Sequence, residues 1–257
     1  VTGSVIINNS ATLDATNITN IYVGGNWQQD GTFTPATNTV TFNGAITQTI
    51  TSSTTPAPTF YNLTVNKPSG TLSTGGVVST LNINNNLTLQ STNSGTFTLP
   101  ATTNILNNLF LDGGTLTAGA TINIQGNWNN NGGTFNHNSG LVVFQVPAGS
   151  TKNIQGTATT QTFYNIDVQG LANNSTLLMN GSTSTIITNN FTLTNGQFGS
   201  NINPSTLIIQ GNLTLTSSGD GFNQNGISGS IKRLFVAGNI TFDMPTANWT
   251  MHDSVIL

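Results

Sequence analysis

Short segments in which apolar and polar residues alternate recur along the whole chain. The clearest is GNLTL at Gly211 to Leu215, where a turn-forming Gly-Asn pair precedes Leu, Thr and Leu. Successive side chains of a strand point to opposite faces, so this pattern predicts a β-strand with leucine inside and threonine outside. Variants of the same segment occur at 61–65, 85–89, 107–111, 164–168, 189–193 and 238–242, and as GNW around Trp27 and Trp128.

The spacing of these segments predicts how the strands are arranged. Eleven steps lead from the strand centre at Trp27 to the one at Val255, with a mean of roughly 21 residues per step. A period of about 20 to 25 residues is typical of a solenoid, in which stacked coils bury an apolar face that no single coil can bury alone. We therefore predict an all-β fold, a single-stranded right-handed parallel β-helix (β-solenoid) with about 20–22 residues per coil and roughly 12–13 coils; the right hand follows from general chirality.

The apolar residues at the strand centres are expected to fill the interior. They are Trp27, Phe42, Leu63, Leu87, Leu109, Trp128, Phe144, Ile166, Phe191, Leu213 and Ile240.

A longer period lies over the first. Trp27 corresponds to Trp128 at an offset of 101 residues, and Phe60 corresponds to Phe163 at a similar offset. This predicts super-repeats of five coils at approximately 21–122 and 123–233, with a partial third copy from 234, inside one continuous solenoid at 1–257. The third copy is displaced by about eight further residues, which we attribute to a turn-rich inserted loop at 219–229. Because the chain starts without Met and stops within the pattern, we expect it to be a segment of a longer protein.

An asparagine precedes the central apolar residue in most of these segments. Stacked side-chain amides can hydrogen-bond to one another, and asparagine tolerates the left-handed conformation of a tight bend. We therefore predict a structural ladder along the coil axis. Its members are Asn26, Asn62, Asn86, Asn108, Asn127, Asn165, Asn190, Asn212 and Asn239.

Five members of this predicted ladder also lie in N-x-T glycosylation sequons: Asn62, Asn86, Asn190, Asn212 and Asn239. In a chain so rich in Asn and Thr, such sequons arise from composition alone, so the structural interpretation is favoured. Whether sugars are attached stays open.

Composition narrows the possible functions. Only 4% of residues are charged, against about a quarter in an ordinary globular protein. The four cations, Lys67, Lys152, Lys232 and Arg233, form no basic stripe, so nucleic acid is not an expected partner. Cysteine is absent, which excludes disulfides and thiolate metal sites. No apolar run approaches the roughly 18 residues of a membrane-spanning helix, and we expect no membrane span in this segment.

Titratable side chains are scarce and scattered. The seven acidic residues are all Asp, and the two histidines, His137 and His252, lie in similar NHNS and MHDS contexts that indicate turns. Asp243 and Asp253 could face each other across neighbouring coils, but solvated turn residues explain them more simply. We therefore expect no catalytic residue, no cofactor site and no metal site. A glycan-cleaving β-helix enzyme, the alternative, would need several Asp gathered in one groove.

Paired threonines raise a further alternative. Rows of stacked T-x-T pairs form a regular array in some ice-binding β-solenoids. Against such an array, the coils vary in length, and Val65, Phe110 and Asp167 interrupt the column of outward threonines when the strand segments are aligned. The T-x-T pairs occur at Thr39/Thr41, Thr96/Thr98, Thr115/Thr117, Thr192/Thr194 and Thr214/Thr216.

The segments GNWxxxGTF, TVTFNG, QTI, TFYNLTV and NNLTL follow one another in a fixed order. In this order the chain resembles the repetitive secreted β-strand-repeat proteins of bacteria, especially giant surface proteins and adhesins of Bacteroidota-like organisms. It is more distantly similar to β-helical adhesins of the filamentous-haemagglutinin type, from which it departs in its irregular coil lengths and its super-repeat. The resemblance implies a secreted, extracellular or cell-surface location and provides no catalytic residues to transfer.

Together these observations predict a structural, non-catalytic segment of an extracellular or cell-surface fibre or adhesin. We expect it to act as a stiff rod that associates with itself, head-to-tail or laterally, into filaments, with surface glycans as a further candidate partner. The alternatives are a glycan-binding or glycan-cleaving β-helix and an ice-binding β-solenoid.

Overall fold

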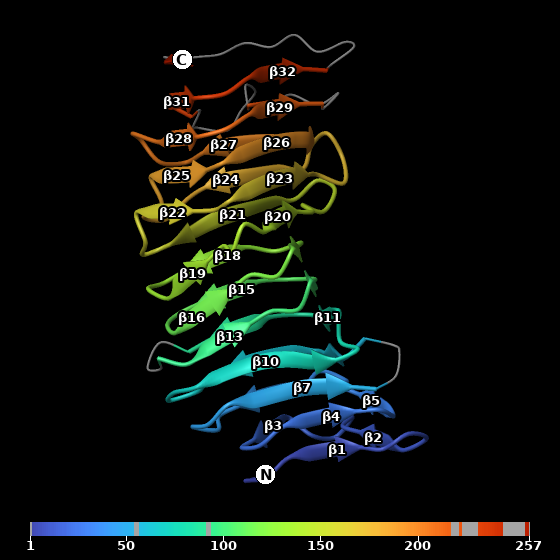
Figure 1. The fold of residues 1–257 in the computed structure, drawn as a ribbon. Helices are drawn as coiled ribbons and strands as arrows, with labels where there is room; N and C mark the ends of the chain where they lie inside the picture. Colours follow the sequence, from blue (N-terminus) through green and yellow to red (C-terminus); the bar gives the residue numbers. More distant parts are fainter. Residues whose placement is uncertain are drawn as a thin grey trace. The chain divides into compact units, whose positions relative to one another are not determined.

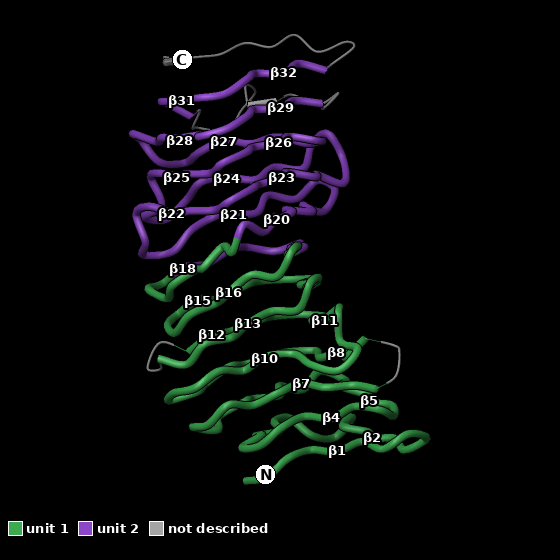
Figure 2. Tube along the Cα trace, in the orientation of Figure 1, with its two compact units in different colours: residues 1–122, 131–138 green, residues 123–130, 139–257 purple. Residues whose placement is uncertain are grey.

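The computed structural model describes residues 2–53, 57–90, 94–216, 221–222, 231–243 and 255–256. These residues form β-strands and turns without a helix, and the strands pair in parallel as a β-solenoid (Figure 1). The predicted fold class is therefore confirmed, whereas the hand of the coil stays a prediction. The chain divides into two compact units, unit 1 (1–122 and 131–138) and unit 2 (123–130 and 139–257; Figure 2).

In unit 1, the strands fall into three sets, and each set takes every third strand along the chain. The first set forms a seven-stranded sheet of β1 (Val5–Ile7), β4 (Trp27–Gln29), β7 (Gln48–Ser52), β10 (Thr71–Gly76), β13 (Thr96–Thr98), β16 (Thr115–Thr117) and β19 (Thr134–Asn136). The second set is divided between two sheets: β2 (Thr12–Asp14) and β5 (Thr32–Thr34) form a two-stranded sheet, and a separate sheet contains β8 (Thr59–Phe60), β11 (Thr80–Ile83) and β14 (Thr102–Ile105), with β17 (Thr121–Ile124) at the unit boundary. The third set is β3 (Asn20–Val23), β6 (Thr39–Phe42), β9 (Asn62–Val65), β12 (Leu87–Leu89) and β15 (Leu109–Leu111).

Unit 2 repeats this arrangement with three sets of its own. The first is β18 (Trp128–Asn130), β21 (Thr151–Gly156), β24 (Thr176–Met179), β27 (Gln197–Ser200) and β30 (Gly221–Phe222). The second is β20 (Leu141–Phe144), β23 (Asn165–Gln169), β26 (Asn190–Asn195), β29 (Leu213–Leu215) and β32 (Ile240–Phe242). The third is β22 (Thr160–Thr162), β25 (Thr185–Thr188), β28 (Thr206–Ile209), β31 (Arg233–Val236) and β33 (Val255–Ile256).

The number of coils differs from the prediction. The described residues form about 9 turns of about 22 residues each, not 12–13 coils. Three of the steps that the sequence suggests as whole coils are partial turns. Trp27 in β4 pairs with Ile50 of β7, whereas Phe42 in β6 pairs with Val65 of β9, so the segment between Trp27 and Phe42 leads from one sheet to another. In unit 2, β18 and β20 likewise lie in different sheets, as do β32 and β33.

Coil length varies because the bends between strands differ in length, and in unit 2 a bulge in β26 opposite Val168 and Gln169 adds a further residue. In unit 1, Leu72 pairs with Phe97 and Leu116 pairs with Phe135, and the first of these two steps along the chain is clearly the longer. The step from Leu213 to Ile240 in unit 2 is longer still. The inserted loop predicted at 219–229 lies outside the described residues, apart from the short strand β30.

The interior of each unit is apolar. Of the eleven predicted core residues, ten are buried, and Ile240 is half-buried. In unit 1, the Trp27 ring packs edge-on against Phe60 at 5.3 Å, and Phe42 contacts Phe60 at 6.4 Å. Such edge-to-face pairs contribute about 0.5–1.5 kcal/mol beyond their area burial.

Unit 2 contains an equivalent group of three rings. Trp128 contacts Phe163 at 5.1 Å, and Phe144 contacts Phe163 at 6.2 Å. The indole Nε1 of each tryptophan donates to a buried glutamine: Trp27 to Gln29 at 3.2 Å and Trp128 to Gln161 at 3.3 Å. The two super-repeats thus build the same aromatic cluster, one in each unit.

Candidate functional site

Asparagine side chains form hydrogen-bonded columns in unit 1. Asn85 Nδ2 donates to Asn62 Oδ1 at 2.9 Å, and Asn107 Nδ2 donates to Asn85 Oδ1 at 2.8 Å. Beside this column, Asn86 Oδ1 accepts the backbone N–H of Asn108 at 3.1 Å. Each bond joins one coil to the next, so the predicted asparagine ladder is present.

Unit 2 contains two such columns. In one, Asn153 Nδ2 donates to Asn127 Oδ1 at 3.3 Å, and Asn180 Nδ2 donates to Asn153 Oδ1 at 3.1 Å. In the other, Asn190 Nδ2 donates to Asn165 Oδ1 at 3.0 Å. This second column continues because Asn190 Oδ1 accepts the backbone N–H of Asn212 at 2.8 Å, and Asn212 Oδ1 accepts that of Asn239 at 2.9 Å.

Two details of the ladder differ from the sequence-based picture. None of the nine predicted members has a positive φ, so no left-handed bend explains their presence. Their amides instead bridge neighbouring coils. Asn26 does not bond to another predicted member; its Oδ1 accepts the backbone N–H of Thr49 at 2.9 Å.

Several ladder residues were not predicted from the strand segments. Asn85 and Asn107 stand one position before predicted members, and their signal is the doubled Asn of NNLTL and NNLFL. Asn153 and Asn180 lie outside any such segment, so only the register of the sheet identifies them. A separate bond joins Asn104 Nδ2 to Asn82 Oδ1 at 2.8 Å.

The amide nitrogens of two sequon asparagines are already engaged. Asn190 Nδ2 donates to Asn165, and Asn62 Nδ2 donates to the carbonyl oxygen of Asn38 at 3.3 Å. A sugar attached to either nitrogen would displace a bond between coils.

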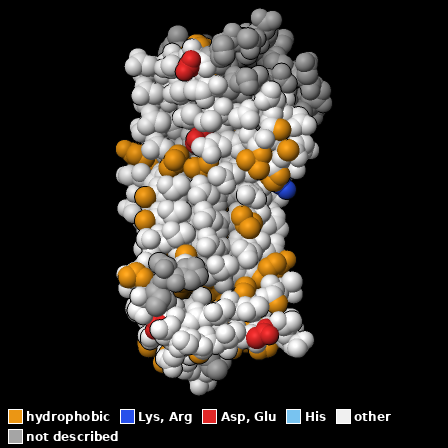
Figure 3. Space-filling view, turned by 90° about the vertical axis from the view of Figure 1, so that its right-hand side faces the viewer, with side chains coloured by type: hydrophobic (Ala, Val, Ile, Leu, Met, Phe, Trp, Pro, Cys, Tyr) orange, Lys and Arg blue, Asp and Glu red, His pale blue; other side chains and the backbone are white. Residues whose placement is uncertain are grey.

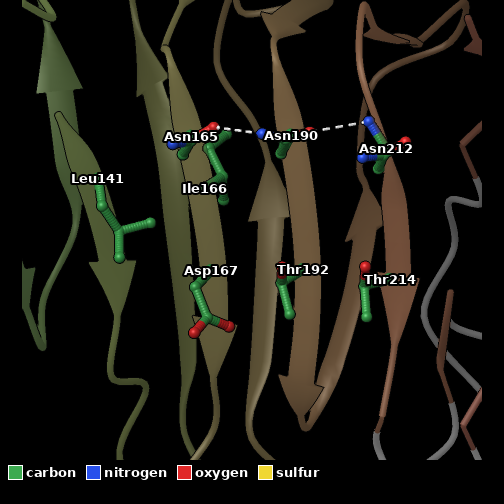
Figure 4. Close-up of a pocket in the computed structure, with 8 residues that line it drawn as sticks. All are labelled: Leu141, Asn165, Ile166, Asp167, Asn190, Thr192, Asn212 and Thr214. Carbon is green, nitrogen blue, oxygen red and sulfur yellow. Dashed lines mark hydrogen bonds between the residues drawn. The ribbon is translucent and has the colours of Figure 1, made fainter. Parts of the chain in front are cut away.

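A shallow polar depression of about 330 Å³ lies on the outer surface of β20, β23, β26 and β29 in unit 2. Figure 4 shows its two rows, one of Asn165, Asn190 and Asn212 and one of acidic and hydroxyl side chains. The second row comprises Asp167, Thr192 and Thr214. Asp167 Oδ1 accepts from Thr194 Oγ1 and its Oδ2 from Gln169 Nε2, both at 2.7 Å. Amide and carboxylate groups in this arrangement can form hydrogen bonds to a hydroxylated ligand.

The acidic residues of the described ranges do not converge on one groove. No three side chains among the described His, Cys, Asp and Glu residues gather as metal ligands would. Hydrogen bonds from the Gln28 side chain and from the backbone and hydroxyl of Ser53 lower the pKa of Asp30, and those from Thr16 lower the pKa of Asp14. Asp243 is exposed, whereas His252 and Asp253 lie outside the described residues.

The most unusual polar side chain is Lys67, a lysine at a position that continues the inward alternation of Leu63 and Val65. It is fully buried in unit 1. Its Nζ donates to the carbonyl oxygens of Gly44 and Ile46, each at 2.7 Å, and to Gln48 Oε1 at 2.8 Å. Gln48 is itself buried, and its Nε2 donates to Val23 O at 2.9 Å. Burial lowers the pKa of Lys67, yet its three acceptors match the three donors of an ammonium group.

The molecular surface is almost free of charge. On the face drawn in Figure 3, charged side chains are isolated among uncharged ones. Within the described ranges, no helix has the length and apolarity needed to cross a membrane.

No family model matches the chain, and the searches of curated proteins and of solved structures also found no match.

Proposed function

We propose that this chain is a structural, non-catalytic segment of an extracellular or cell-surface fibre or adhesin. The observation that carries the proposal is the set of asparagine columns, which add side-chain hydrogen bonds between coils to those of the parallel strands. The side-chain bonds and the strand hydrogen bonds together oppose the separation of neighbouring coils within each unit. A low-charge surface adds little electrostatic repulsion between copies that lie side by side.

Lateral association has a candidate surface in unit 2. Ile187, Ile208 and Phe235 are paired in register on β25, β28 and β31 and point outward, each half-buried. The three side chains form a continuous outward apolar row across three neighbouring strands. We propose that it contributes to lateral contacts in a filament, beside the head-to-tail mode.

Sedimentation velocity over a range of protein concentrations, combined with negative-stain electron microscopy, tests the proposal. Filaments or concentration-dependent oligomers are expected. Ile208→Lys should weaken lateral association, whereas Thr206→Lys, a matched change two residues away on the same face, should have less effect. A chain that stays monomeric at every concentration would contradict the self-associating fibre.

The polar depression of unit 2 favours a second candidate function, binding of surface glycans. Its outward amides and the Asp167 carboxylate offer hydrogen bonds to sugar hydroxyls. A glycan array with Asp167→Ala as the comparison would test this. Glycan binding that is the same in both proteins would exclude the depression as the site.

A further inference from the structure

Five strands of unit 1 carry a regular set of outward threonines. In the seven-stranded sheet, Thr71, Thr96, Thr115 and Thr134 are paired in register on β10, β13, β16 and β19. The stacking of these strands can be followed in Figure 1. This first row is continuous over four coils.

A second row runs beside the first, two residues further along each strand. Thr98 and Thr117 are paired in this row, and Asn136 follows them on β19. Ser73 and Thr49 hold the corresponding positions of β10 and β7 and are paired with each other. We call the two rows together the threonine array.

The alternation of each strand turns these side chains outward. Leu72, Phe97 and Leu116 lie between the two rows and are fully buried, so the residues on either side of them face solvent. The rows are about 6.7 Å apart along the strands, and their members repeat about every 4.8 Å across the strands.

The three residues that interrupt the aligned column in the sequence do not lie in the threonine array. Phe110 lies on β15 beside Thr88, and Val65 is a buried residue of β9, so both belong to the sheet of β9, β12 and β15. Asp167 belongs to β23 in unit 2. None of the three interrupts the threonine array.

The array is uncharged and non-aromatic. Strands β7, β10, β13, β16 and β19 contain no charged residue, and no aromatic side chain stands in either row to stack on a sugar ring. Within the described part of the chain, no side-chain hydrogen bond occupies the hydroxyls of the threonines in the two rows. Each threonine therefore presents a methyl group and a free hydroxyl to solvent. Because β-branching restricts χ1, these groups are held in place before any ligand arrives.

From this geometry we propose that the threonine array binds the surface of ice. A rigid, uncharged lattice of methyl and hydroxyl groups is complementary to a solid whose oxygen atoms also repeat on a lattice of a few ångströms. A binding site for a single small molecule would not need a row that repeats over four coils. The proposal concerns one sheet of unit 1 and does not depend on whether the chain forms filaments.

The test compares two pairs of substitutions in the full chain. Thr96→Tyr with Thr115→Tyr places bulky side chains in adjacent positions of the array. Thr64→Tyr with Thr88→Tyr is the matched control, because these threonines are also half-buried, outward and paired in register, but on the sheet of β9, β12 and β15. Circular dichroism establishes that both variants are folded.

Ice recrystallisation and partition of the protein into growing ice are then measured. The unmodified chain and the control pair are expected to inhibit recrystallisation and to enter the ice. The array pair should lose at least about half of this activity, because a large side chain at the centre of a complementary surface lifts its neighbours from contact.

Three results would overturn the proposal. The unmodified chain could fail to affect ice, or the control pair could lose as much activity as the array pair. In the third, the chain binds microcrystalline cellulose or chitin through the array without affecting ice, which would identify a crystalline polysaccharide as the ligand. None of these results bears on filament formation, which sedimentation tests separately.

Discussion

Replacing Lys67 with methionine tests whether a buried ammonium group holds a bend of unit 1 together. Methionine is similar in length, so the apolar packing of the stem is largely kept. The substitution removes the donor to Gly44 O and to Ile46 O. Gln48 Oε1 keeps a donor, because it also accepts the backbone N–H of Gly44 at 3.0 Å.

The expected magnitude follows from the two carbonyl groups that lose their partner. A buried acceptor left without a hydrogen bond costs about 1–3 kcal/mol, and the lower half of that range applies because both bonds are only partly buried. The loss of two gives a decrease of about 2–4 kcal/mol in the free energy of unfolding. Relief of the desolvation of the ammonium group acts in the opposite direction.

Urea denaturation followed by circular dichroism and tryptophan fluorescence measures this change, and hydrogen exchange at residues 43–48 localises it. Lys152→Met is the matched control, because Lys152 is half-buried on β21; its effect should stay within about 0.5 kcal/mol. If Lys67→Met proves as stable as the unmodified chain, or more stable, then desolvation outweighs the three hydrogen bonds. The assignment of Lys67 as a stabilising link between coils would then be wrong.

Three further changes have expected outcomes. Thr103→Val should raise the free energy of unfolding by about 1 kcal/mol, seen as a higher urea midpoint, because the buried Thr103 hydroxyl has no partner in the described residues and valine has the same shape. Asn190→Ala should lower stability by about 1–2 kcal/mol in the same assay, since it removes the bonds to Asn165 and Asn212, whereas Thr192→Ala should change it less. Acid unfolding should differ between Asp30→Asn and the unmodified chain. The lowered pKa of Asp30 stabilises the fold above pH 3.8, and this contribution disappears as the pH falls through the pKa of the folded state. If Asp30→Asn and the unmodified chain lose stability equally as the pH falls, Asp30 does not have this role.

The alternation of apolar and polar residues was sufficient to predict the parallel solenoid. In a segment such as Leu213 to Leu215, Leu and Thr cannot exchange faces without exposing two leucines, so the inner face is defined by the sequence alone. Burial of Leu213 and Leu215 follows from the same constraint. Local patterning therefore determines which side chains fill the core.

Register between coils could not be read in the same way. Whether Thr98 lies beside Thr117 or beside Thr88 depends on the lengths of bends that contain no strand segment. The unequal steps into and out of β13, from Leu72 to Phe97 and from Phe97 to Leu116, show how widely these lengths vary. The sequence identifies Thr96/Thr98 and Thr115/Thr117 as T-x-T pairs, but their stacking into the threonine array is a consequence of register, as are the ladder members Asn153 and Asn180. Alignment of similar segments in the sequence therefore found neither the stacking nor these two asparagines.

Local patterning also does not explain how a lysine is accommodated in the interior at position 67. Lys67 follows Val65 and Asn66 in the strand alternation, at a position where an inward side chain is expected to be apolar. Its acceptors Gly44, Ile46 and Gln48 come from the preceding coil. Only the folded chain brings these oxygens together, and without them a buried lysine would be costly.

The super-repeat and the coil have periods that do not match. An offset of 101 residues between Trp27 and Trp128, at about 22 residues per coil, is about 4.6 coils, so the five whole coils that the sequence suggested are not completed. The sheet that contains Trp27 accordingly passes from β16 to β19 and omits Trp128. Trp27 nevertheless packs against Phe60, and Trp128 packs against Phe163, which corresponds to Phe60 in the second super-repeat. Because that contact depends only on the path within one super-repeat, duplication of the sequence can preserve a core cluster while the copies occupy different sheets. Outward surfaces such as the threonine array, which require residues from successive coils of one sheet, are not copied in this way, and we therefore expect their function to belong to one unit and not to every repeat.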